Sequence, residues 1–92
     1  MTLALCFHPE AESELEAAVD WYDDQQHGLG DDFLELVEEA VELIFEWPRV
    51  APVFSGWDRE PVVRTQAVAR FPNRVLYYLT DHELMLVAFA HN

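Results

Sequence analysis

The spacing of apolar residues changes once along this chain, and that change limits the folds the chain can adopt. Between residues 9 and 47 the apolar side chains recur every three or four positions, which is the spacing of one helix face. Between residues 62 and 90 they tend to alternate with polar ones, which is typical of strands with one buried face. A helical first half is therefore followed by a sheet-forming second half.

Two helices are predicted in the first half. Pro9 suits the first helical position because its missing N–H is not needed there. The second helix runs over 29–47 and ends before Pro48. Gly28 can supply the left-handed residue that ends the first helix, and the short connection predicts an antiparallel hairpin. The apolar stripe expected on the second helix comprises Phe33, Val37, Ala40, Val41, Ile44 and Trp47.

Four short segments predict strands. The run LALCF is too short for a helix and predicts a buried strand. Three more strands follow in the second half, joined by short turns that make them antiparallel neighbours. The strands are expected at 3–7, 62–71, 74–81 and 83–90, with turns at 71–73 and 81–82. We therefore predict one α+β domain over residues 1–92, with an antiparallel sheet packed against a two-helix antiparallel hairpin.

Charge is distributed very unevenly between the two halves. Residues 1–47 hold fourteen acidic side chains and no basic one, whereas residues 48–92 hold four acidic side chains and all five arginines. The net charge is −13, and lysine is absent. Such asymmetry often marks two surfaces with different partners, although a solvated helical surface is the favoured interpretation of the acidic half.

Three of the arginines lie close together, at Arg64, Arg70 and Arg74. If residues 62–71 form one strand, Arg64 and Arg70 share a face, and the small apolar residues between them share the other. We expect the apolar face to meet the helices, so that the arginines point away from them. The planar guanidinium suits carboxylate or phosphate partners, although ion pairs with nearby acids are the alternative.

Other chemistry has little support in the sequence. The four histidines lack metal-ligand spacing, and neither a zinc motif nor a phosphate-binding loop occurs, so we expect no metal and no cofactor. The lone Cys6 cannot form an internal disulfide and is expected to be a small buried side chain. No run approaches the ~18–20 apolar residues of a membrane span. We expect a cytoplasmic protein that does not enter the membrane.

Several phrases, in their order, resemble the RelE/ParE superfamily of bacterial toxins. They are FHPEAESELEAAVDWY, GLGDDFLELVEEAVELI, WPRVAP and VRTQAVARFPNRVLYYL, which leads to LVAFAH. The resemblance implies a small toxin neutralised by a cognate antitoxin. RelE-like members cleave messenger RNA on the ribosome, whereas ParE-like members inhibit DNA gyrase. The long helical hairpin and the FPN turn resemble the ParE-like branch, which makes a protein inhibitor the favoured reading over an enzyme.

The resemblance also suggests site residues. For an RNA-cleaving member, the catalytic candidates are Arg64, Arg70, Tyr78 and His91. For antitoxin or target binding, the candidates are Arg64, Arg70 and Arg74, which an acidic arm of the antitoxin could meet.

Two departures from the family affect the expected activity. Lysine is absent, and the sequence stops at His91-Asn92, where relatives commonly add a basic residue or two. Affinity for nucleic acid comes mainly from neutralised phosphates, so this acidic chain is disfavoured as a binder of free nucleic acid. Three readings remain: a ParE-like inhibitor, a RelE-like ribonuclease, and a non-toxic relative that acts only as a binding module. Weak or silent toxicity is expected.

Overall fold

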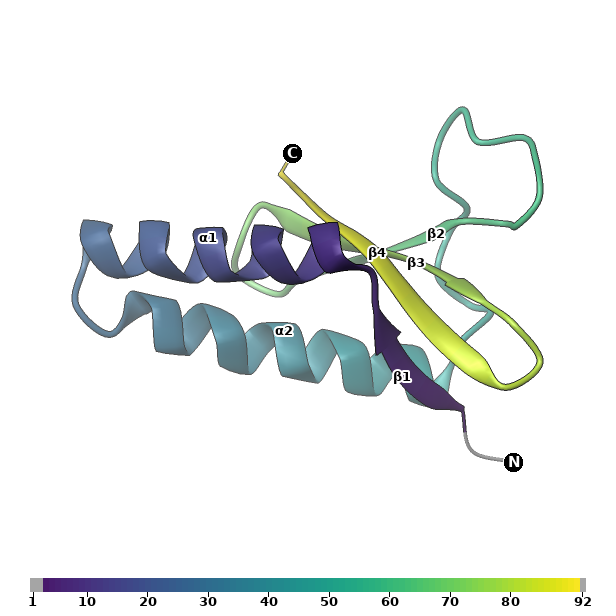
Figure 1. Cartoon of the computed structure of the whole chain (residues 1–92). Helices are drawn as coiled ribbons and strands as arrows, with labels where there is room; N and C mark the ends of the chain where they lie inside the picture. Colours follow the sequence, from purple (N-terminus) through teal and green to yellow (C-terminus); the bar gives the residue numbers. More distant parts are fainter. Residues whose placement is uncertain (1–2, 92) are drawn as a thin grey trace.

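A computed structural model describes residues 3–91 and contains the predicted helical hairpin (Figure 1). Helix α1 spans Pro9–Gln25 and helix α2 spans Leu29–Glu46. The Nδ1 atom of His8 accepts a hydrogen bond from the Glu10 N–H at 3.2 Å and so caps the start of α1. Gly28 does adopt a left-handed conformation, with φ 89°, but it precedes α2 directly rather than ending α1.

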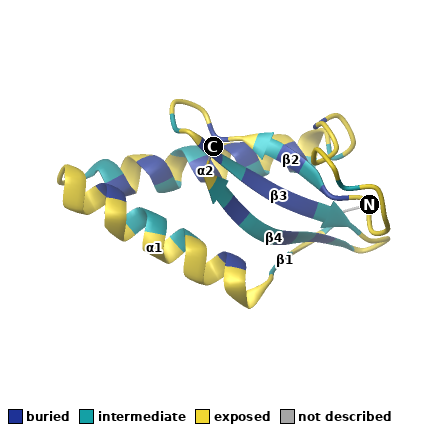
Figure 2. Cartoon of the chain, turned by 90° about the horizontal axis from the view of Figure 1, so that it is seen from above, coloured by how far each residue is buried: buried dark blue, intermediate teal, exposed yellow. Residues whose placement is uncertain are grey.

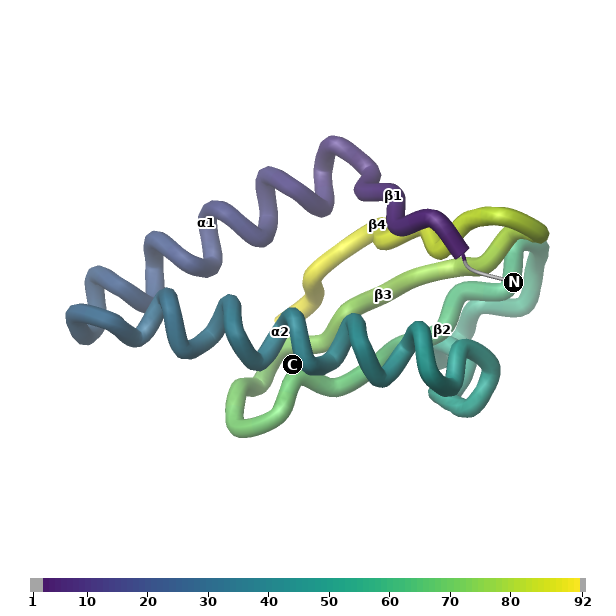
Figure 3. Tube along the Cα trace, turned by 90° about the horizontal axis from the view of Figure 1, so that it is seen from below, coloured from purple at the N-terminus to yellow at the C-terminus, as the bar shows by residue number. Residues whose placement is uncertain are grey.

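Four strands form one sheet in the order β1-β4-β3-β2. Their bounds are Ala4–Phe7 (β1), Arg64–Ala67 (β2), Asn73–Leu79 (β3) and Glu83–His91 (β4). The three C-terminal strands are antiparallel neighbours, as predicted. Strand β1 runs parallel to β4, so the sheet is mixed rather than wholly antiparallel. The predicted α+β fold is confirmed, and both helices lie on one face of the sheet (Figures 1 and 3).

The first strand of the C-terminal hairpin is shorter than predicted. It covers four residues instead of 62–71, and the chain turns over residues 68–72. Arg70 lies in this turn with φ 67°, a left-handed conformation that a strand residue does not adopt. Asn73, predicted to belong to the turn, is buried and opens β3.

The core lies between the sheet and the helices (Figure 2). Three aromatic rings meet there, because Tyr22, Phe33 and Phe71 have ring centroids 4.8–5.0 Å apart. The fully buried large side chains are Phe33, Ile44, Val75, Tyr77, Leu84 and Leu86. Within residues 3–91, every buried side-chain nitrogen or oxygen has a hydrogen-bond partner.

The two helices approach each other closely near their connection. Gly30 is buried, and its N–H donates to Asp23 Oδ1 at 2.8 Å. A β-carbon at this position would lie 2.5 Å from the Val19 carbonyl oxygen, so a glycine is required at this contact. Neither helix, as described, is long and apolar enough to cross a membrane.

The segment between α2 and β2 extends the sheet and then projects from it (Figure 1). Val53 forms a bridge to Arg64, and the Phe54 N–H donates to the Val63 carbonyl at 2.7 Å. At the tip, Trp57 Nε1 donates to the Pro61 carbonyl, and the Arg59 guanidinium lies 4.4 Å from the Trp57 ring centre. Contacts within the loop therefore define its shape.

Candidate functional site

Arg74 is the arginine that faces away from the helices. Along β3 the buried Val75 and Tyr77 belong to the core that the helices cover, so Arg74 and Leu76 lie on the opposite, open face, where Leu76 is itself buried. Arg74 Nε donates to Thr65 Oγ1 at 2.7 Å. This hydrogen bond fixes the guanidinium over β2. Directly opposite Arg74 on the neighbouring strands are only small residues, Ala67 and Ala90.

Arg64 faces the helix side, contrary to the sequence prediction. Its partner across the β2–β3 pair is Tyr77, and residues directly opposite in a sheet share a face. The Arg64 guanidinium donates to the Ala51 carbonyl at 2.8 Å, so its observed hydrogen bond goes to the backbone rather than to an acid. The prediction placed Ala67 and Ala69 toward the helices, yet both are exposed. A shift of one residue reverses every side chain in a strand.

Arg64 and Tyr78 both line a hollow of about 220 Å³ where β2 begins and β3 ends. Arg49 and Glu60 line the same hollow. Burial raises the pKa of the neighbouring Tyr77 hydroxyl, and the positive charge of Arg64 partly offsets that rise. Tyr77 donates to the Pro48 carbonyl at 2.9 Å, so it acts in packing rather than in chemistry.

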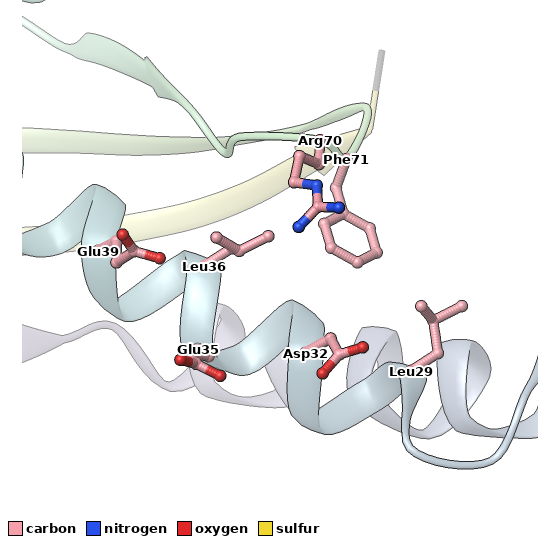
Figure 4. Close-up of a pocket in the computed structure, with 7 residues that line it drawn as sticks. All are labelled: Leu29, Asp32, Glu35, Leu36, Glu39, Arg70 and Phe71. Carbon is pink, nitrogen blue, oxygen red and sulfur yellow. The ribbon is translucent and has the colours of Figure 1, made fainter.

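Arg70 lies beside the acidic helix instead of opposite it. Figure 4 shows Arg70 and Phe71 on the β2–β3 turn, facing side chains of α2 across a hollow of about 450 Å³. The α2 residues that line this hollow are Leu29, Asp32, Glu35, Leu36 and Glu39. The interpretation that the basic residues lie opposite the acidic helices is therefore wrong for Arg64 and Arg70, and it holds for Arg74.

The predicted site residues do not converge on one centre in the described part of the chain. Arg64 and Tyr78 share one hollow, Arg70 lines another, and Arg74 lies on the open face. His91 is exposed at the end of β4, opposite Asn73. Across residues 3–91, no three His, Cys, Asp or Glu side chains are grouped as metal ligands would be.

Sequence reasoning missed an apolar surface at the end of α2. Trp47, placed in the buried stripe by its helical spacing, is 58% exposed, and Leu43 is 48% exposed. Val50 follows and is 75% exposed. Exposed apolar residues that lie near one another often mark contact surfaces. Trp47 follows the last helical residue, so helical spacing did not determine its direction.

Cys6 is half-buried at the first strand, on the open face. Its thiol donates to Glu83 Oε2 at 3.1 Å, and this hydrogen bond is the largest of the effects that raise the pKa of the thiol. A raised pKa keeps the thiol protonated and unreactive. The expectation of a structural cysteine therefore agrees with its contacts, although the side chain is only partly covered.

Comparison with known proteins gives a match only at the level of structure. No protein-family model and no curated protein matches the chain. A chain of the chromosomal ParDE TA system from P. aeruginosa has 21% identity and a TM-score of 0.70, with 98% of this chain and 96% of that chain covered. A chain of the E. coli DinJ-YafQ toxin–antitoxin complex has 12% identity and a TM-score of 0.66, covering 99% and 93%.

The third structure is a chain of the YoeB dimer from Staphylococcus aureus. It has 12% identity and a TM-score of 0.66, with 100% of this chain and 99% of that chain covered. All three alignments span nearly the whole of both chains. The chain thus shares its fold with chains of a ParDE TA system, a DinJ-YafQ toxin–antitoxin complex and the YoeB dimer, in agreement with the fold expected from the RelE/ParE resemblance.

Proposed function

We propose that this chain is the toxin of a type II toxin–antitoxin pair, that it acts by binding a protein target such as DNA gyrase, and that a cognate antitoxin neutralises it. The fold supports the first part, because the similar chains come from ParDE and DinJ-YafQ systems. The same neighbours support a protein antitoxin as the partner.

The observation that favours a protein target over RNA cleavage is the open face of the sheet. Cleavage of a phosphodiester is helped by several cations aimed at the charge that develops, together with an acid and a base. Around Arg74 the described face offers one guanidinium, held by Thr65, and small apolar neighbours. Such a face is better suited to packing against a protein than to binding a phosphate backbone.

A second candidate function rests on the hollow at Arg64. Arg49, Arg64 and Tyr78 all line this hollow. A RelE-like ribonuclease could use the guanidiniums to bind phosphate and the hydroxyl as an acid. Glu60 in the same hollow weakens this reading, since a carboxylate repels phosphate.

Induced expression, alone and together with the adjacent reading frame, tests the proposal. We expect at most a weak slowing of growth; where growth slows, cells should be filamentous and show a DNA damage response, and co-expression of the antitoxin should restore growth. Purified protein should also inhibit supercoiling by gyrase. Codon-dependent cleavage of ribosome-bound messages, abolished by Tyr78→Phe, would instead assign the RelE-like function. Silent expression with stable antitoxin binding would assign a binding module.

A further inference from the structure

Helix α2 carries a seven-residue repeat along one side. Leucines recur at Leu29, Leu36 and Leu43, and each begins a heptad whose fourth residue is acidic. Those fourth positions are Asp32, Glu39 and Glu46, and Glu35 and Glu42 end the first two heptads. A seven-residue spacing keeps a row of side chains in line along a helix that packs lengthwise on another helix. The repeat therefore describes a seam as long as the helix.

The seam becomes more exposed toward the end of the helix. Leu29 and Leu36 are half-buried and touch the core with part of their surface, whereas Leu43 is 48% exposed. The Trp47 N–H donates to the Leu43 carbonyl, the Trp47 side chain is 58% exposed, and exposed Val50 follows. At the other end, the seam opens into the hollow beneath Arg70 and Phe71 (Figure 4). Within the described chain, the exposed end of this seam remains uncovered.

Charge specifies what can cover the seam. The acidic rows that flank the leucines are exposed; residues 1–47 contain no lysine or arginine, and Arg70 of the β2–β3 turn is the basic side chain that lies beside them in the described chain. A second copy of this chain would bring like charges together, which opposes association. A partner helix with lysines or arginines beside its own apolar row would meet opposite charges on the carboxylates of both acidic rows.

We propose that the α2 seam, formed by Leu29, Leu36, Leu43 and Trp47, is the docking surface for a basic amphipathic helix of the partner protein. An apolar groove flanked by charge is the usual receptor for such a helix. The eighteen residues of α2 extend for about 27 Å, enough for five turns of a partner helix. The inference rests on the proposed function only in naming the antitoxin as the carrier of that helix.

This partner chemistry replaces the acidic arm expected from the sequence. That arm was to meet Arg64 and Arg70 on an open sheet face. Arg64 instead faces the helix side and donates to the Ala51 carbonyl, and Arg70 lies beside the α2 carboxylates. The larger exposed surface of uniform charge is acidic, so the complementary segment is basic.

A pair of designed three-heptad peptides tests the seam on the whole protein. Both carry leucine at the first and fourth heptad positions, and one has lysine and the other glutamate at the flanking positions. We expect the lysine peptide to bind about tenfold or more tightly than its glutamate twin and to weaken as salt increases. Binding should shift the Trp47 indole N–H resonance. Equal affinity, or no binding by the lysine peptide, would overturn the proposal.

Variants place the contact on the seam. Leu43→Glu should reduce binding at least about tenfold, whereas Trp21→Glu, at a 57% exposed position on α1, should leave it unchanged. Both sites are exposed, so both variants should fold. Glu39→Lys combined with Glu46→Lys should reverse the preference toward the glutamate peptide. An unchanged preference would contradict the charge argument even if the peptides bind.

The same variants separate this inference from the proposed function. If the antitoxin still neutralises Leu43→Glu protein at wild-type affinity, the seam is not its docking surface, while the toxin assignment stands. If expression proves harmless but the lysine peptide binds the seam, the toxin assignment fails and the docking surface stands. Sedimentation of the free protein tests whether a second copy of the chain occupies the seam. A dimer that Leu43→Glu disrupts would assign the seam to that second copy.

Discussion

Tyr22 connects the helical layer to the sheet through one buried hydrogen bond. Its hydroxyl donates to Asn73 Oδ1 at 2.6 Å. Tyr22→Phe keeps the ring packing on Phe33 and Phe71 but leaves the amide oxygen without this donor. We expect a loss of about 1–3 kcal/mol in the free energy of unfolding, measured in urea. Tyr78→Phe, on the open face, is the matched control and should cost less; equal losses would contradict this role for the hydroxyl.

Two buried tyrosines predict how stability depends on alkaline pH. Burial raises the pKa of Tyr22 and Tyr77 above their ordinary value of about 10. The folded state therefore retains these protons more strongly than the unfolded chain does. The stability they contribute is fully present below about pH 10 and is lost as pH rises through the folded-state values.

Urea midpoints measured from about pH 8 to about pH 11 should therefore fall above pH 10. The Tyr22→Phe, Tyr77→Phe double variant begins from lower stability, because it loses the hydrogen bonds to Asn73 and Pro48. Its midpoint should nevertheless change less with pH over this interval. If the urea midpoint of the double variant falls as steeply with pH as that of the wild type, groups other than these two tyrosines cause the loss of stability at alkaline pH.

At the scale of elements, Glu14 completes an edge that β1 leaves uncovered. Strand β1 accompanies β4 only as far as Leu86, after which the chain enters α1. Beyond that point Glu14 Oε1 accepts the Phe89 N–H at 3.0 Å, close to the irregularity between β3 and β4. The Glu14 carboxylate thus accepts a backbone N–H that a longer β1 would otherwise pair.

Removing that carboxylate should expose the end of β4 to local opening. Glu14→Ala leaves a partly buried backbone N–H unpaired, and we expect a cost of about 1–3 kcal/mol. In the Glu14→Ala variant, the rate of amide hydrogen exchange should increase more at Phe89 and His91 than at Leu84. Glu14→Gln retains an acceptor oxygen and should restore most of the protection, and Glu16→Ala is the exposed control. Unchanged exchange in Glu14→Ala would show that this hydrogen bond does not stabilise the end of β4.

The types and order of the elements were predictable because periodicity is a local property. The spacing of apolar residues specified both helices. Pro9 marked the start of α1, and Pro48 lies just beyond the end of α2, whereas Gly28 precedes α2 instead of ending α1. The parallel pairing of β1 with β4 was not predictable, since it joins residues nearly eighty positions apart and leaves no local signal.

The candidate site was less predictable than the fold. Arg64 was placed on the wrong face because the alternating pattern was read through a turn that begins at Val68. Its hydrogen-bond partner, the Ala51 carbonyl, lies in an irregular segment with no periodicity. The carboxylates of the helices were read as a solvated surface, yet Glu14 bonds to a strand 75 residues away. The face of the sheet that a side chain occupies and its long-range partners both depend on tertiary packing, which periodicity does not encode.

At the scale of the whole molecule, the separation of charge is the dominant electrostatic feature. Fourteen carboxylates belong to the first 47 residues, all on two adjacent helices, while the arginines follow in the second half. The molecule measures 39 × 29 × 23 Å. At ~0.01 M salt the screening length is about 30 Å, so the helical carboxylates repel one another across most of the protein. The net charge of −13 must therefore oppose folding in dilute buffer.

Added salt should relieve this repulsion and stabilise the fold. Between ~0.01 M and ~1 M sodium chloride the screening length falls from about 30 Å to about 3 Å. We expect the melting temperature to rise, and each 1 kcal/mol of relief corresponds to roughly 4–8 °C for a domain of this size. Glu38→Gln with Glu42→Gln removes two exposed carboxylates one turn apart on α2. This variant should melt higher than wild type in dilute buffer and respond less to salt. If both proteins gain equally, the salt acts through apolar burial and the acidic helices do not limit stability.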